Sequence, residues 1–252
     1  MKYKLEDICS FRKSKIAVNK LNRRTYISTE NMLPNKGGIA EASSLPTISL
    51  TQEFRKGDIL VSNIRPYFKK IWKAKYDGGC SNDVLVFAAN SNTDKDFLYY
   101  ILANDDFFAY SMATSRGTKM PRGDKTSIMH YEIPVFDIDL QRKIVSVLKS
   151  IDEKIKLNNA INNNLEQQAQ AIFKSWFVDF EPFSNRKPSD WSVSTLGNVS
   201  IMGAGGDKPQ NVSPIRTDLY EYPIYSNGLS DEGLYGFTDK PKISEESVTV
   251  SA

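Results

Sequence analysis

The sequence is poor in the side chains that metal and redox chemistry require. Its 252 residues hold one histidine, His130, and two cysteines, Cys9 and Cys80. A protein-built zinc site takes about four His, Cys or carboxylate ligands, so we expect no metal site. The cysteines lie far apart without a paired spacing, which predicts free thiols in a reducing cytoplasm. A lone histidine beside strand-forming residues is more often structural than catalytic.

Long apolar runs and a strong net charge are also missing. No segment approaches the roughly 20 apolar residues of a membrane-spanning helix, and the N-terminus MKYKLEDICSF has no apolar signal region. We therefore expect a cytoplasmic chain without a membrane partner. The formal net charge is only +3, so any affinity for nucleic acid has to come from local clusters of charge.

Two stretches resemble catalytic motifs and then depart from them. GAGGDKP, from Gly203, is glycine-rich but lacks the Gly-Lys-Ser/Thr ending of a phosphate-binding loop. DFEPF, from Asp179, resembles the adenine-holding Asp-Pro-Pro-Tyr/Phe motif of amino-methyltransferases. In this chain Glu181 replaces the first proline, and no glycine-rich methyl-donor loop is present. We expect a binding protein with no catalytic residue, no cofactor and no metal of its own.

Residues 1–138 have the pattern of one compact unit that mixes helices and strands. β-Prone runs bounded by turn formers predict strands at Ile59–Val61 and Val84–Ala88. Apolar residues at near-helical spacing predict one helix over residues 92–112, with Thr93 as its N-terminal cap. The unit is long enough to bury a core of its own.

The following segment, residues 139–180, predicts one uninterrupted helix that would span roughly 55–60 Å at 1.5 Å per residue. Its apolar positions alternate in steps of four and three, which is the heptad pattern of a coiled coil. This heptad seam consists of Ile144, Leu148, Ile151, Ile155, Asn158, Asn162, Leu165, Ala169, Ile172 and Trp176. Such a seam requires a partner helix, and its two asparagines would fix the register at a cost in stability.

A linker and a second unit are predicted after the helix. Residues 181–190, EPFSNRKPSD, contain two prolines and several turn formers. Residues 191–252 then repeat segments of the first unit in the same order, which indicates a tandem duplication with an incomplete second copy. The matching segments begin at Leu5 and Leu196, at Thr25 and Tyr222, and at Gly57 and Glu245.

Three clusters of basic residues provide the positive evidence for a function. Lysine and arginine suit contact with phosphate, and arginine can also read guanine edges. The clusters contain Arg116, Lys119, Arg122 and Lys125 in a Gly/Ser/Thr-rich loop, Arg65, Lys69 and Lys70 among aromatics, and Arg12 and Lys13 near the N-terminus. Any single cluster is explained equally well as solvated surface, but three in one domain favour a surface that binds a polyanion.

The order of these parts resembles the specificity (S) subunit of type I restriction–modification systems. The most specific stretch has a Gly-Thr loop at Gly117, a strand over residues 133–136, Gln141 at the helix start, and the step IDEKI from Ile151. KGDILVSNIRP and SNDVLVF are also similar to family segments. The resemblance implies an α+β target recognition domain, a long coiled-coil helix, and the start of a second, repeated recognition domain.

The resemblance also implies partners. Each recognition domain of such a subunit reads one half of a split target in double-stranded DNA, and the long helices pair antiparallel to fix the gap between the half-sites. Methyltransferase (M) subunits and a restriction/translocase (R) subunit join it. The S subunit is not an enzyme itself, whereas the assembled complex methylates adenine and cleaves DNA.

One departure from the family pattern concerns length. A full member would continue past Ala252 through the rest of the second domain and a second long helix. We therefore expect a truncated subunit, and a homodimer through the long helix is one way to satisfy the heptad seam. The alternatives left open are a coiled-coil interaction protein and a homodimeric half-subunit, both without independent DNA recognition.

Overall fold

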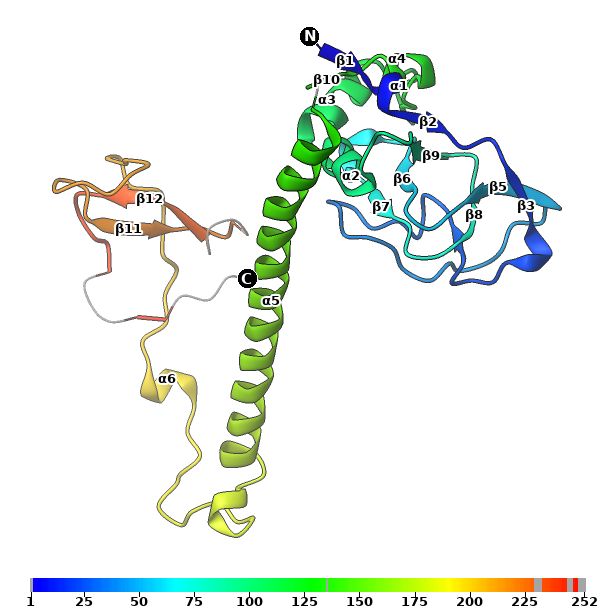
Figure 1. Cartoon of the computed structure of the whole chain (residues 1–252). Helices are drawn as coiled ribbons and strands as arrows, with labels where there is room; N and C mark the ends of the chain where they lie inside the picture. The colour runs from blue at the N-terminus through cyan, green and yellow to red at the C-terminus, as the bar shows by residue number, and fades with distance from the viewer. Residues whose placement is uncertain (1, 135, 229–232, 244–246, 249–252) are drawn as a thin grey trace. The chain divides into compact units, whose positions relative to one another are not determined.

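The computed structural model describes residues 2–134, 136–228, 233–243 and 247–248. The chain forms two compact units, Met1–Ala169 and Gln170–Ala252, and the long helix α5 (Ile138–Phe177) contributes residues to both (Figure 1). None of the helices in these described ranges has the length and apolar character needed to cross a membrane. The predicted architecture, a mixed α+β domain followed by a long helix and further strands, is confirmed.

In the described part of unit 1, the strands form two four-stranded sheets and one two-stranded sheet. The first sheet is antiparallel, in the order β2 (Cys9–Phe11), β9 (Val84–Ala89), β6 (Ile59–Ser62) and β7 (Ile71–Lys73). The second has the order β3 (Lys15–Ala17), β5 (Leu50–Phe54), β8 (Gly78–Cys80) and β4 (Tyr26–Ile27), with β8 and β4 parallel. The two-stranded sheet pairs β1 (Lys2–Lys4) with β10 (Glu132–Pro134).

Short helices connect these strands and precede α5. The α-helices are α1 (Leu5–Ile8), α2 (Lys95–Ala103), α3 (Asp105–Ala113) and α4 (Lys125–Met129). The 3₁₀ helices are η1 (Val18–Lys20) and η2 (Pro66–Phe68).

Both faces of the first sheet are covered, which explains why its central strands are continuous apolar runs. Ile59 and Val61 of β6 pack with Leu98 of α2 on the helical side. Leu60, which points the other way, packs with Phe54 of the second sheet. Each such buried side chain contributes roughly 1.5–3 kcal/mol to folding. The strands β6 and β9 confirm the two predicted strands, each with one further residue at its C-terminal end.

The predicted helix over residues 92–112 is interrupted, so that α2 and α3 replace it. Asn104 has an extended backbone, and its side-chain oxygen accepts a hydrogen bond from the N–H of Asp106, which starts a new helix. The prediction that Thr93 caps the first helix is wrong. Asp94 is the cap, because its carboxylate accepts two backbone N–H groups of the first turn at 2.8 and 3.1 Å, and an ionised acceptor also suits the helix N-terminus.

The predicted long helix is present as α5, with 40 residues. The carboxylate of Asp137 caps it by accepting a hydrogen bond from the N–H of Leu140 at 2.8 Å. The buried side chains of α5 are Gln141 and Val145, close to its start. Every side chain from Lys149 to Lys174 is exposed, so most of the heptad seam has no packing partner among the described residues.

Unit 2 begins with the last turns of α5, which end in an aromatic cluster. Trp191 stacks on Phe177 with ring centroids 5.6 Å apart, and Phe180 and Phe183 also pack against its ring. Phe180 has a left-handed backbone with φ of 55°, after which the 3₁₀ helix η3 (Glu181–Phe183) begins. The stretch DFEPF therefore follows the end of α5 and contains η3.

Two further elements of unit 2 fall on predicted repeats. The helix α6 (Leu196–Val199) has four residues like α1, and in both the next N–H donates to the carbonyl oxygen of the first helical residue. The hairpin of β11 (Tyr222–Tyr225) and β12 (Leu234–Thr238) begins at the second predicted repeat. The third, from Glu245, lies largely outside the described residues, and the proposed domain boundaries at residues 138, 180 and 190 stay predictions.

Candidate nucleic-acid interface

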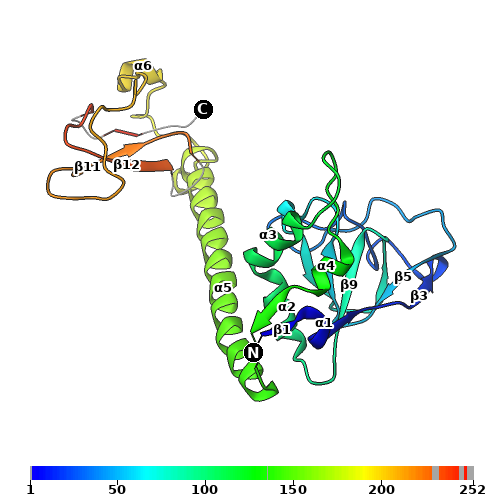
Figure 2. The same ribbon diagram turned by 90° about the horizontal axis from the view of Figure 1, so that it is seen from above.

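The predicted basic loop forms a hairpin between α3 and α4, which we call the basic hairpin (residues 116–122). The backbone N–H groups of Arg116 and Arg122 each donate to the other's carbonyl oxygen at 2.9 Å. Gly117 has a φ of +91°, a left-handed value that glycine adopts without steric cost. The segment between α3 and α4 projects as a loop beyond these two helices (Figure 2). Residues 116–120 and 122 are exposed, so they are accessible to a large partner.

The basic hairpin is fixed to the segment that follows β6. The N–H of Arg65 donates to the carbonyl oxygen of Pro121 at 2.8 Å, and the N–H of Gly123 donates to that of Asn63 at 3.2 Å. A Cβ atom at Gly123 would lie 2.8–2.9 Å from side-chain atoms of Ile128, Asn63 and Ser111, so a larger residue here would force these side chains to shift. The fold thus brings together two of the three predicted basic clusters.

The segment after β6, which we call the basic turn (residues 65–70), forms the second part of this surface. Arg65 and Lys69 flank η2, and both have a left-handed backbone with φ of 50°. Between them Tyr67 and Phe68 expose 49% and 38% of their surface. Exposed rings beside cations provide apolar and stacking contacts in addition to charge.

Carboxylates neutralise part of the charge of the basic hairpin. A guanidinium nitrogen of Arg116 lies 3.2 Å from Asp124, and one of Arg122 lies 3.3 Å from Asp83. In the described ranges, the exposed cations of this region without a carboxylate partner are Lys119 and Lys125. Of the four cations predicted here, two therefore carry charge that no carboxylate of the described ranges offsets.

A third segment, residues 33–38, lies against the basic turn and was not predicted to belong to the surface. The ammonium groups of Lys36 and Lys69 both contact the carboxylate of Asp105, at 2.8 and 2.9 Å. Hydrogen bonds from these two lysines lower the pKa of Asp105 to about 2. Lys36 has few cations near it in sequence, so no local charge pattern predicts that it belongs to a basic surface.

The third predicted cluster has a different environment. The guanidinium of Arg12 donates two hydrogen bonds to the carboxylate of Asp58, one of them at 2.8 Å. Asp58 is only 3% exposed, and loss of Arg12 would leave this buried carboxylate with the backbone N–H of Arg55, at 2.8 Å, and without its cation. Arg12 therefore has a structural task, whereas Lys13 remains an exposed cation. Their roles in DNA binding stay predictions.

The described residues offer little to catalytic or metal chemistry. No group of three or more His, Cys, Asp or Glu side chains in these ranges is placed to hold a metal ion. Cys9 and Cys80 are free and buried. Burial raises the pKa of both thiols to about 12, so they stay protonated at neutral pH.

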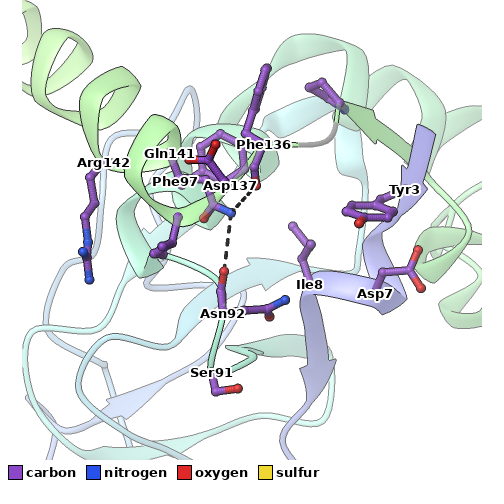
Figure 3. A pocket seen from close by; sticks show the side chains of 12 residues that line it. Tyr3, Asp7, Ile8, Ser91, Asn92, Phe97, Phe136, Asp137, Gln141 and Arg142 are labelled. Atoms are coloured by element: carbon purple, nitrogen blue, oxygen red, sulfur yellow. Dashed lines mark hydrogen bonds between the residues drawn. The ribbon is translucent and has the colours of Figure 1, made fainter. Parts of the chain in front are cut away.

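Gln141 fixes the start of α5 to unit 1. Its side-chain oxygen accepts a hydrogen bond from the N–H of Asp94 at 2.9 Å. Its amide nitrogen donates to the carbonyl oxygens of Phe136 at 3.0 Å and Asn92 at 3.5 Å (Figure 3). With 4% of its surface exposed, Gln141 is a buried amide with partners at both ends, which gives the glutamine at the helix start a structural task.

A cavity of about 780 Å³ opens beside this junction. Its lining mixes ring and aliphatic carbons with one arginine and two carboxylates. These residues include Tyr3, Asp7, Ile8, Phe136, Asp137 and Arg142 (Figure 3). The opposed charges give it no excess of cations, so we do not include it in the polyanion-binding surface.

Polar contacts on α2 orient the next turns of α5. Asp96 accepts hydrogen bonds from Lys149 of α5, at 2.7 Å, and from Lys73 of β7. Burial by itself would raise the pKa of Asp96, but the hydrogen bonds from Lys149 and Lys73 outweigh it and hold the pKa below its usual value. The hydroxyl of Tyr100 donates to Asp152 at 2.7 Å. The direction of the helix relative to the sheets of unit 1 is thereby set.

Comparison with known proteins gives consistent matches. The model of the type I restriction modification DNA specificity domain matches residues 1–167. The type I restriction enzyme HindI specificity subunit of Haemophilus influenzae is 32% identical over 188 residues, which cover 71% of this chain and 41% of that subunit. The S subunit of a type I restriction–modification system from M. genitalium covers 96% of this chain, with 17% identity and a TM-score of 0.60.

A second solved structure has a similar fold. It comes from work on complex assembly and conformational transition of the type I R-M system, covers 87% of this chain, and has 19% identity with a TM-score of 0.54. The chain spans 41% of the HindI subunit and 63% and 60% of the two solved chains. At these identities the structures support the fold, and the match to residues 1–167 supports descent. The chain belongs to the family of type I restriction–modification DNA specificity subunits.

Proposed function

We propose that unit 1 is a target recognition domain that binds one half of a bipartite sequence in double-stranded DNA. One observation carries this proposal: two basic clusters from distant parts of a specificity-family chain form one surface. Backbone hydrogen bonds of Arg65 and Gly123 hold the two clusters together. A preformed, projecting and cationic surface suits a duplex, whose phosphates supply much of the affinity.

Different cations in this surface suit different contacts. Lys119 and Lys125 are exposed and contact no carboxylate among the residues that the structure describes, which suits phosphate contacts that position the domain. Arg116 and Arg122 are oriented by their ion pairs, and an oriented guanidinium can donate two hydrogen bonds to a guanine edge. Lys70 is also held, because its ammonium donates to the carbonyl oxygen of Thr29 at 2.6 Å.

The test is a triple substitution in this region, Lys119→Ala, Arg122→Ala and Lys125→Ala. Affinity for a random-sequence duplex should fall, and the slope of log K against log salt should decrease by about 0.9 for each phosphate that the variant no longer binds. A matched control removes three exposed lysines of α5, by Lys143, Lys154 and Lys156→Ala. Unchanged affinity of the triple variant at low salt would remove Lys119, Arg122 and Lys125 from the interface.

We further propose that the chain acts with partners and performs no catalysis of its own. In this proposal M subunits bind along the helix, an R subunit joins the assembly, and residues 191–252 begin a second recognition domain. Co-purification with an M subunit from the same genome, followed by mapping of methylated adenines, tests it. When unit 1 is replaced by the corresponding unit of another specificity subunit, a change in one half of the methylated sequence would support the assignment. A pattern indifferent to unit 1 would contradict it.

The exposed seam of α5 favours a second candidate, in which helix pairing is the main task. Ile151, Ile155 and Leu165 each expose half or more of their surface, and an apolar seam of this kind requires a partner helix. The partner helix can come from a second copy of the chain or from another segment of the same protein. Sedimentation at tens of micromolar separates the cases: a monomer excludes the homodimer. Salt-insensitive, negligible binding to duplex DNA would favour pairing without DNA recognition.

In an antiparallel pair of two copies, the spacing of the seam makes it complementary to itself. Asn158 of one copy faces Asn162 of the other, and the reverse pair lies next to it across the two-fold axis. Ile155 then faces Leu165, so that apolar layers flank the central amides. The arrangement places polar side chains only opposite polar ones, which is the condition for a buried amide to specify register.

A further inference from the structure

The segment 33–38 and the basic turn are held side by side by their backbones. The N–H of Asn35 donates to the carbonyl oxygen of Phe68 at 2.8 Å, and the N–H of Lys36 donates to that of Lys69 at 2.9 Å. Asn35, Lys36 and Lys69 have φ values of 52°, 61° and 50°. A left-handed backbone is uncommon in residues other than glycine and persists where the surroundings enforce it. The two lysines are thus brought together by residues whose backbone conformation is unfavourable for side chains other than glycine.

The two lysines converge on one carboxylate. Nζ of Lys36 lies 2.8 Å from one oxygen of Asp105, and Nζ of Lys69 lies 2.9 Å from the other. The side chains of Lys36, Lys69 and Asp105 are accessible, with 36%, 34% and 61% of their surface exposed, respectively. Two positive charges on one negative charge leave an excess of one cation, so the group still attracts an anion.

Asp105 has the properties of an anion that can leave this position. It is the first residue of α3, where the helix N-terminus favours negative charge without fixing the side-chain rotamer. Its carboxylate presents two oxygens to two ammonium groups, as a phosphodiester would with its two free oxygens. The exposed tyrosine and phenylalanine of the basic turn lie next to Lys69 in the chain, so the group is part of the surface proposed to meet DNA.

We propose that Asp105 occupies a phosphate-binding position formed by Lys36 and Lys69, and that a duplex has to displace it in order to bind there. This inference rests on the proposed function of unit 1. It adds Lys36 to the interface and gives Asp105 a restraining role. Because the carboxylate competes equally with every phosphate, it weakens binding to all sequences. A target that also forms base contacts tolerates the loss, whereas a random sequence depends on phosphate contacts almost entirely.

The ion pairs of the basic hairpin follow the same arrangement. Asp124 holds Arg116, and Asp83 holds Arg122. Together the three carboxylates contact four of the cations in the surface, and Lys119 and Lys125 keep their full charge among the residues that the structure describes. The surface therefore combines two cations without a carboxylate contact among the described residues and four that carboxylates contact.

The test is Asp105→Asn, measured as binding of the full chain to a random-sequence duplex over a range of salt concentrations. The variant should bind about three- to tenfold more tightly at 0.1 M salt, with a slope steeper by about 0.9 for each lysine that gains a phosphate. Asp106→Asn is the matched control, because it makes the same charge change one residue further along α3. Asp106 makes no ion pair within the described residues, and its substitution should alter affinity less than twofold.

Two further variants complete the test. Lys36→Ala with Lys69→Ala should weaken binding, and Asp105→Asn should have no effect in that background. Asp105→Ser keeps a residue that suits a helix N-terminus and should reproduce the effect of Asp105→Asn if the latter variant folds poorly. Equal effects of the Asp105 and Asp106 variants, or weaker binding after loss of Asp105, would overturn the inference. Failure of the unmodified chain to bind any duplex would instead overturn the proposed function itself, and this inference with it.

Discussion

The junction of α5 with unit 1 allows a quantitative prediction for Gln141→Ala. The substitution removes a hydrogen bond to the N–H of Asp94 at 2.9 Å and one to the carbonyl oxygen of Phe136 at 3.0 Å. The interaction with Asn92 at 3.5 Å is at the limit of a hydrogen bond and adds little. A typical hydrogen bond contributes about 1 kcal/mol, and a buried group left without a partner costs roughly 1–3 kcal/mol. We expect the free energy of unfolding of unit 1 to decrease by about 2–4 kcal/mol.

The assay is unfolding by urea followed through Trp72, which is buried between the sheets of unit 1 with 7% of its surface exposed. Trp176 and Trp191 lie in unit 2 and should be replaced by phenylalanine, so that the fluorescence reports unit 1 alone. Gln141→Met is the control, since it keeps the length of the side chain and removes both hydrogen bonds. A decrease below about 0.5 kcal/mol for Gln141→Ala would refute the reasoning, because exposed surface substitutions have effects of that size.

Two other predictions concern thiols and the helix seam. Cys9 and Cys80 should react with a thiol reagent roughly a thousandfold more slowly in the folded chain than in urea, because burial suppresses the reactive thiolate form. Mass spectrometry of the labelled chain measures the two rates, and rapid labelling of the native chain would contradict the prediction. Asn158→Leu with Asn162→Leu should raise the melting temperature of the helix pair and broaden the spin-label distances across it, since a slip of one heptad shifts the helices by roughly 10 Å. Asn163→Leu, off the seam, should leave the distance distribution unchanged.

Periodicity predicted those parts of the fold that depend on neighbouring residues. The strand at Ile59 is buried on both faces, and a short apolar run is the pattern of such a strand. The single helix predicted over α2 and α3 was wrong because Asn104 offers its side chain to the N–H of Asp106. Helical spacing continues across that point, so an apolar pattern cannot show the interruption. The pairing order of the strands, including the parallel contact of β4 with β8, was not predicted.

The candidate site was predicted in part. The cations of the basic hairpin and the basic turn were identified from composition, and the structure places these segments together through Pro121 and Arg65. Their assignment to DNA contacts stays a prediction. Lys36 and Asp105 were missed, because neither belongs to a local cluster and their contact joins distant segments. For Arg12 the sequence misleads in the other direction. Its cluster is basic in sequence, but its guanidinium is bound by the buried carboxylate of Asp58, which precedes β6.

The order of residues is enough to identify the family pattern, the long helix with an amide-containing seam, and the scarcity of side chains for metal and redox chemistry. These properties are read from the identity and spacing of residues along the chain, which folding does not alter. Which cations share a surface, and which of them Asp83, Asp105 and Asp124 neutralise, depends on how the chain folds. Charge interactions act over a few ångströms in space, and the spatial neighbours on this surface come from segments far apart in the chain.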